Sequence, residues 1–81
     1  MLEFIELNNE GLEILEEWYK DKEVLNRLGG KLPLQRWFQY VQQNPNYFAW
    51  MVFEKNSPVG QIEVEIYSYN SASIGIMTNP P

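Results

Sequence analysis

The pattern of apolar and polar positions predicts a short strand, then helices, then three further strands. Residues 3–7 alternate between polar and apolar side chains, which is typical of a half-buried strand, and Leu2, Phe4 and Leu7 are its candidates for burial. Asn8 and Asn9 end this strand, because asparagine favours turns, and an asparagine at a helix start accepts a backbone hydrogen bond.

Helical spacing of apolar residues begins directly after this strand. We expect a first helix over residues 10–20, where Glu10 suits the positive end of the helix dipole. Asp21 can cap a second short helical turn over residues 24–28, and the glycine pair 29–30 ends that turn. The apolar stripe of the first helix consists of Leu12, Ile14, Leu15, Trp18 and Tyr19.

A third helical segment is predicted to begin at Pro33. Proline is well placed as the first residue of a helix, because its missing N–H donor would be unpaired there anyway. The helix ends by Asn44, since the residue before Pro45 avoids helical backbone angles. Its apolar stripe consists of Leu34, Trp37, Phe38 and Val41, and we interpret Trp18 and Trp37 as core residues.

The last third of the chain predicts three antiparallel strands. Residues 47–53 are seven apolar residues in a row, which is typical of a strand that is covered on both faces. A turn over residues 55–58 leads to a strand over residues 59–69, and a turn at 70–71 leads to a strand over 72–78. In the middle strand Ile62, Val64 and Ile66 share one face, while Gln61, Glu63, Glu65, Tyr67 and Tyr69 share the other.

These elements predict an α+β fold with the helices on one face of the sheet. The last strand is then an exposed edge that carries Ile74, Ile76 and Met77 and no charge that would discourage pairing with another chain. Two helices on one face also cannot cover both sides of the apolar strand 47–53. We therefore expect residues 1–81 to be a single incomplete domain of a shortened chain, unless a partner chain supplies the missing cover.

Composition restricts the chemistry. The 81 residues include no cysteine and no histidine, which excludes disulfides and thiolate or imidazole zinc sites, so we expect no metal. Proton transfer would have to use carboxylates, tyrosine, lysine or water. The net charge of −5 argues against nucleic acid and anionic membranes as main partners. The chain has no apolar run long enough for a membrane helix and no secretory signal, so we expect a cytoplasmic protein.

Four stretches of sequence carry a resemblance to a known family: residues 17–21, 32–37, 50–60 and 74–80. With the order of elements, they resemble the amino-terminal half of the GCN5-related N-acetyltransferase (GNAT) family, in particular its bacterial branch similar to ribosomal-protein acetyltransferases. The resemblance implies acetyl-CoA as co-substrate and direct transfer of the acetyl group to a primary amine of a small molecule or peptide. No enzyme nucleophile is required, which agrees with the absence of cysteine and histidine.

The resemblance also implies site residues. Backbone groups of Ile76, Met77 and Thr78 would pair with the pantetheine arm of the cofactor. The acceptor amine would be bound by Tyr19, Arg27, Gly29, Gly30 and Tyr67. The arginine- and glycine-rich loop that holds the pyrophosphate in this family has no counterpart here, so we expect the isolated chain to bind acetyl-CoA weakly and to have little or no activity.

Glu65 and Glu63 are the candidate general bases, because they lie on one face of the predicted strand near the expected acceptor groove and a carboxylate can accept a proton through water. The alternative for both is the solvent-facing side of an ordinary strand. Two other functions stay open. One is a noncatalytic module that forms a homodimer through residues 72–78, and the other is a protein that attracts basic ligands to the acidic residues between 3 and 23.

Overall fold

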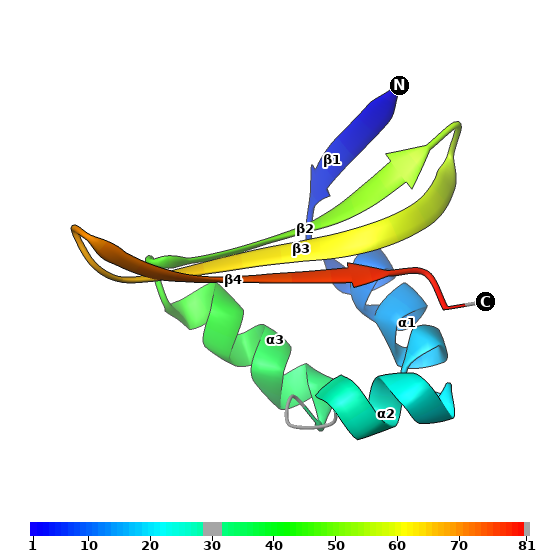
Figure 1. The fold of residues 1–81 in the computed structure, drawn as a ribbon, viewed down its shortest axis with the longest axis horizontal. Coiled ribbons are helices and arrows are strands. Elements are labelled where there is room, and N and C mark those ends of the chain that lie inside the picture. The colour runs from blue at the N-terminus through cyan, green and yellow to red at the C-terminus, as the bar shows by residue number, and fades with distance from the viewer. Residues whose placement is uncertain (29–31, 81) are drawn as a thin grey trace.

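The computed structural model describes residues 1–28 and 32–80, which form one antiparallel sheet with three helices on one of its faces (Figure 1). The strands lie in the order β1-β2-β3-β4. The sequence-based prediction of an α+β fold is therefore confirmed. The elements are β1 (Leu2–Glu6), α1 (Asn9–Trp18), α2 (Lys22–Leu28), α3 (Leu34–Gln43), β2 (Tyr47–Glu54), β3 (Ser57–Ser68) and β4 (Ser71–Thr78).

Side-chain caps fix the starts of the first two helices. Asn8 Oδ1 accepts a hydrogen bond of 2.8 Å from the Gly11 amide at the start of α1. Asp21 Oδ1 accepts bonds from the amides of Glu23, at 2.9 Å, and Val24, at 3.3 Å, at the start of α2. Each cap satisfies N–H groups that a helix start leaves without an intrahelical partner. The cap predicted at Asp21 is confirmed, and of the two asparagines before the first helix Asn8 is the one that caps it.

Several predicted boundaries differ from the observed ones by one or two residues. Helix α1 ends at Trp18, two residues before the predicted end, and Pro33 is the residue before α3 instead of its first residue. The turn between β2 and β3 contains Lys55 and Asn56 alone, with φ of 50° and 68°, so β3 begins at Ser57. Two consecutive left-handed residues are the geometry of a tight hairpin turn, which a longer turn over 55–58 did not anticipate.

The hydrophobic core lies between the helices and one face of the sheet. Leu15 of α1 and Met51 of β2 are its most completely buried large side chains. Helix and strand approach closely at Gly11, where an added Cβ would lie 2.8 Å from Met51 Cγ. The other members of this core are Leu7, Leu12, Trp18, Tyr19, Val24, Leu34, Trp37, Phe38, Val41, Ala49 and Met77.

The structure corrects three expectations about which side chains are buried. The face of the sheet away from the helices is apolar, and the polar side of β3 faces the helices. Leu2 and Phe4, the predicted buried residues of β1, are 49% and 56% exposed on β1. Met77, predicted on an exposed edge, is buried in the core. The interpretation of the polar side of β3 as solvent-facing is wrong for Glu63, which is 9% exposed. The helices cover this side of the sheet (Figure 1).

We predict that Gly11→Ala destabilises the protein although alanine is the better helix former. The added methyl group would overlap Met51, which is buried and cannot move aside, and overpacking of this kind costs about 1–3 kcal/mol. The gain in helix propensity is about 1 kcal/mol. Urea unfolding measures the difference. The control Glu13→Ala, at an exposed position of α1, should change the free energy of unfolding by less than about 0.5 kcal/mol, and a stabilised Gly11→Ala protein would contradict the close packing.

Candidate functional site

Two carboxylates lie on the helix-facing side of β3. Glu63 and Glu65 are two residues apart, so their Cα atoms are about 7 Å apart along the strand. Glu63 stands opposite Gly75 of β4, and a Cβ at Gly75 would lie 2.9 Å from Glu63 Cγ. The missing side chain at Gly75 therefore leaves the space in which the Glu63 side chain extends toward β4.

A tyrosine and a tryptophan hold Glu63. Trp37 Nε1 of α3 donates a hydrogen bond of 3.0 Å to the Tyr47 hydroxyl, and that hydroxyl donates its own proton to Glu63 Oε2. The rings of Trp37 and Tyr47 meet edge to face, with centroids 6.3 Å apart. Burial, and then the hydrogen bond to Glu63, raises the pKa of Tyr47 well above its ordinary value. Tyr47 therefore remains a proton donor to the carboxylate.

Glu65 has a second, more exposed set of partners. The Tyr40 hydroxyl donates to Glu65 Oε2, and Asn44 Nδ2 lies 3.4 Å from the same oxygen and 3.2 Å from the Tyr40 oxygen. The hydrogen bond to Glu65 is the largest cause that raises the pKa of Tyr40. The rings of Tyr40 and Tyr47 are 5.5 Å apart, edge to face, so the two sets of partners are in contact.

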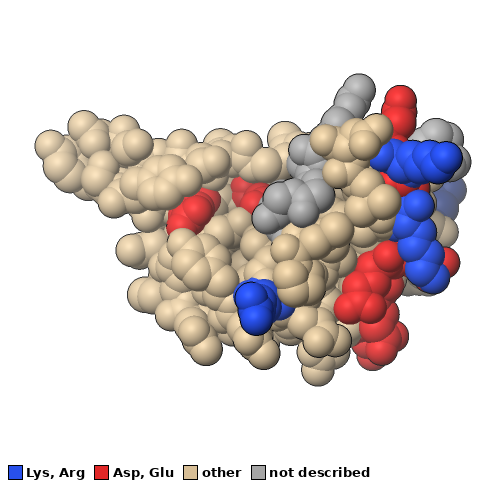
Figure 2. Space-filling view, turned by 90° about the horizontal axis from the view of Figure 1, so that it is seen from below, with Lys and Arg blue, Asp and Glu red and all other residues tan. Residues whose placement is uncertain are grey.

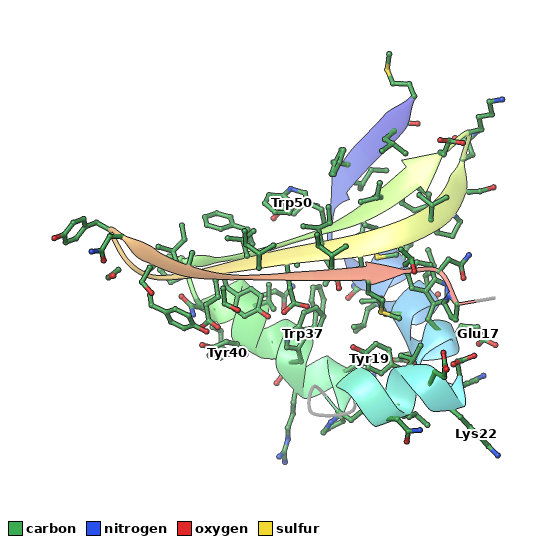
Figure 3. The ribbon with its side chains drawn as sticks, in the orientation of Figure 1. Glu17, Tyr19, Lys22, Trp37, Tyr40 and Trp50 are labelled. Atoms are coloured by element: carbon green, nitrogen blue, oxygen red, sulfur yellow. The ribbon has the colours of Figure 1, made fainter. Side chains whose placement is uncertain are left out.

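Tyr19 lies on the same side of the sheet, at the end of α1. Figure 3 shows Tyr19, Trp37 and Tyr40 all beneath the sheet, on the side that carries the helices. Burial, and then the negative charge of Glu63, raises the pKa of Tyr19 to about 12. Tyr19 also lines a depression of about 320 Å³ together with Glu16, Leu32, Pro33, Leu34 and Gln35. A predicted acceptor-binding residue and a predicted base are thus brought together.

The other predicted acceptor residues have different outcomes. Tyr67 is 63% exposed near the far end of β3, and its charge when ionised acts on Tyr40. Gly29 and Gly30 lie outside the described residues, as does the side chain of Arg27. Sequence analysis placed Trp37 in the core and missed Tyr40 and Tyr47 as partners of the carboxylates. The available signal was chemical: a buried glutamate needs donors, and Tyr47 lies at the start of the strand next to β3.

The outer edge of β4 is the place where an extended cofactor arm could bind. β4 is the last strand of the sheet, and no described strand pairs with its outer side. The Met77 side chain is buried, so Met77 can offer its backbone alone, whereas Ile76 and Thr78 are exposed. Among the described residues, Gln61 Nε2 is a buried donor without a hydrogen-bond partner, and Gln61 stands opposite Met77.

The edge of β4 offers backbone groups of the kind that an extended ligand with amides, such as the pantetheine arm of acetyl-CoA, requires. A strand edge can bind an extended chain through its N–H and C=O groups. The described residues contain no glycine-rich loop that opens a helix, the usual cradle of a pyrophosphate. Within residues 1–28 and 32–80 the chemistry thus concerns the arm of the cofactor.

Charge is distributed unevenly over the helix-covered side. Figure 2 shows this side, and most of its Lys, Arg, Asp and Glu side chains gather at the end that carries α1 and α2.

Within the described ranges 1–28 and 32–80, no helix has the length and apolarity needed to cross a membrane.

Comparison with known proteins gives one relative and one solved structure. The relative is an uncharacterized N-acetyltransferase, YfmK of Bacillus subtilis strain 168, which is 28% identical over 69 residues, or 85% of this chain and 46% of the relative. The structure is the N-acetyltransferase PseH of Campylobacter jejuni in complex with acetyl coenzyme A. Its TM-score is 0.67 at 18% identity, over 99% of this chain and 55% of PseH. No protein-family model matches the sequence.

The chain therefore has part of the fold of an N-acetyltransferase of the GNAT type. It spans about half the length of the proteins that it matches.

We predict that the stability of the protein falls between about pH 10 and about pH 12 as Tyr19 ionises. The folded-state pKa of Tyr19 is raised from 10.0 to about 12, so the unfolded chain loses this proton first as the pH rises. The free energy of unfolding is unaffected by Tyr19 below about pH 10 and then decreases by up to about 1.4 kcal/mol per pH unit.

Urea unfolding at a series of alkaline pH values measures this slope, and Tyr19→Phe should remove the part due to Tyr19. Glu63→Gln should lower the pKa of Tyr19, because it removes the nearby negative charge, as followed by NMR of tyrosine labelled with ¹³C at Cζ. Glu65→Gln is the matched control and should act on Tyr40 instead. A Tyr19 resonance that titrates equally in all three proteins would contradict the proximity of Tyr19 to Glu63.

Proposed function

We propose that this chain supplies the acceptor side and one wall of the cofactor groove of an acetyl-CoA-dependent N-acetyltransferase of the GNAT family, acting on a primary amine by direct transfer. The observation that carries the proposal is Glu63, held by the Tyr47 hydroxyl beneath the helices and extended toward β4 over Gly75. The resemblance of residues 17–21, 32–37, 50–60 and 74–80 supports a place in the bacterial branch similar to ribosomal-protein acetyltransferases.

Glu63 is the group that prepares the amine. A primary amine is protonated at neutral pH and has no lone pair for attack, so its proton must first be removed. Glu63 binds the ammonium group through a carboxylate oxygen and accepts this proton, directly or through water. Because Tyr47 donates to Oε2, it fixes the orientation of the carboxylate.

Glu65 and the tyrosines hold the acceptor in place. Glu65 lies about 7 Å farther along the same face of β3 and attracts a second positive charge or the ammonium on its way in. The rings of Tyr40, which is exposed, and Tyr47, which is partly exposed, offer surface against which an alkyl ammonium packs. Tyr19 closes the site on the α1 side and stays protonated up to strongly alkaline pH.

The edge of β4 holds the cofactor arm. Backbone groups of Ile76, Met77 and Thr78 bind the amide groups of the pantetheine. When bound, acetyl-CoA supplies the acetyl group as an activated thioester. No residue of the chain has to act as a nucleophile, in keeping with a sequence without cysteine or histidine.

We predict that acetyl-CoA and acetyl-pantetheine bind this chain about equally well, in about the millimolar range. The described residues hold the arm and offer no cradle to the pyrophosphate, so its removal should cost little. The measurement is an NMR titration of the ¹⁵N-labelled chain with each compound, in which the amides of Ile76, Met77 and Thr78 should shift most. Shifts that leave β4 unaffected, or a much tighter complex with acetyl-CoA, would contradict the assignment of the groove.

We predict that Glu63→Gln weakens binding of a primary amine by about 10-fold, because the substitution removes the negative charge that attracts the ammonium. n-Butylamine and the uncharged n-butanol are suitable probes, titrated by NMR at neutral pH. Glu65→Gln should have the smaller effect of the two, and n-butanol should bind both variants alike. Equal affinity of the original protein and Glu63→Gln for n-butylamine would remove Glu63 from the acceptor site.

A further inference from the structure

A cavity of about 340 Å³ opens beside the end of β1, between α3 and β2. β1 ends at Glu6, which stands opposite Trp50, so the first residues of β2 extend past β1 at this edge. The strand order places this edge on the far side of the sheet from β4, which is the proposed cofactor edge. The walls of the cavity come from residues 6–7 and 38–50. The cavity is therefore a place of its own, apart from the cofactor groove.

The bottom of the cavity is apolar, and its polar side chains lie at the opening. Glu6 and Gln42 line it and are exposed to solvent. The volume is at the lower end of the range for ligand sites, which is about 300–1,000 Å³, so a ligand that fits is small. The lining residues that are 9% exposed or less are Leu7, Phe38, Val41 and Ala49.

The charge around the cavity is negative. Of the described residues that line it, Glu6 alone is charged. Glu6 stands directly opposite Trp50, so its carboxylate lies on the same face of the sheet as the Trp50 ring. Val41 and Gln42 belong to the last turn of α3, where a helix carries partial negative charge, and this turn has no basic side chain. The carboxylate and the end of the helix both favour a cation.

Aromatic rings are more abundant in the lining than free hydrogen-bond acceptors. The rings of Phe48 and Trp50 are stacked, with centroids 6.2 Å apart and planes at 11°. Asn44 Oδ1 already accepts a hydrogen bond of 2.9 Å from the Asn46 amide. A primary ammonium has three N–H donors to satisfy, whereas a methylated ammonium is held by ring faces and by charge. The aromatic residues of the lining are Phe38, Tyr47, Phe48 and Trp50.

We propose that this cavity binds a small quaternary ammonium compound. The methyl groups on its nitrogen contact the aromatic rings and the apolar bottom, and Glu6 at the opening supplies the opposite charge. The proposal goes beyond the proposed function and does not rest on it, because a quaternary nitrogen has no lone pair and cannot accept an acetyl group. Tyr47 lines the cavity and also donates to Glu63, so the two sites share one residue.

The test uses choline and its uncharged isostere 3,3-dimethylbutan-1-ol, each titrated into the ¹⁵N-labelled chain and followed by NMR at neutral pH. We expect choline to bind with a Kd of about a millimolar and the alcohol to bind at least about 10-fold more weakly, since it lacks the positive charge. The largest shifts with choline should be those of the Trp50 indole N–H and of the Phe48 and Ala49 amides. Figure 3 shows Trp50 on the side of the sheet away from Trp37 and Tyr19, so its indole signal reports on this cavity and not on the acceptor site.

Two substitutions test the two sources of affinity. Glu6→Gln should weaken choline binding about 5-fold and leave the alcohol unchanged, because it removes charge alone. Trp50→Leu keeps an apolar side chain without the ring and should weaken choline binding about 10-fold. Glu6 is exposed, so circular dichroism should show that Glu6→Gln remains folded. Glu3→Gln, at an exposed carboxylate of the same strand that does not line the cavity, is the matched control and should bind choline like the original protein.

Three results would overturn the proposal. The first is equal affinity for choline and the alcohol, and the second is choline binding that neither Glu6→Gln nor Trp50→Leu weakens. The third is a set of choline shifts confined to Glu63 and the edge of β4, which would place the ligand in the acceptor site. The titration of Glu63→Gln with n-butylamine is a separate measurement, so either proposal can fail while the other stands.

Discussion

The burial of Glu63 beneath the helices is the constraint on which the rest of the site depends. A carboxylate that leaves water costs several kcal/mol unless donors replace the lost hydration, and Tyr47 is placed to do this, with Trp37 behind it. The same constraint explains Gly75, since a larger residue on β4 would displace the glutamate. Three elements, α3, β2 and β4, are thus adapted to one side chain of β3.

Alternation in the sequence predicted where the strands lie but not which face of each strand the helices cover, and the reason is physical. A period of two divides β3 into an apolar and a polar set, but it does not say which set lies under the helices. Burial of the apolar set was the simple expectation, and the structure buries Gln61 and Glu63 instead. The helix caps at Asn8 and Asp21 were predictable because they depend on near neighbours. The tight turn was not, because Lys55 and Asn56 adopt left-handed angles without a glycine.

The partners of the carboxylates could be predicted only in kind. The absence of cysteine and histidine left tyrosine, lysine and carboxylates as the groups that handle protons, and the structure places tyrosines around both glutamates. Which tyrosines take part follows from the register, in which Tyr47 stands opposite Glu65 and its hydroxyl reaches Glu63. Register depends on the turn and on contacts between distant residues, neither of which the local pattern contains.

The register of β3 also determines which side chains lie on the sheet face opposite the helices. A slip of one residue would carry Ile62, Val64 and Ile66 under the helices and expose Glu63, and hydrophobic burial alone would favour that slip. The two-residue turn, the irregular pairing between Val52 and Phe53 and the bond between Tyr47 and Glu63 oppose it. These contacts hold an apolar surface in water if the chain stays alone, at a cost that a second covering layer removes. A layer over the sheet face opposite the helices would bury both sides of β2. A strand of seven consecutive apolar residues is typical of such a doubly covered position. The register of β3 thus places the two glutamates on the helix-covered side of the sheet and the isoleucines on the other side.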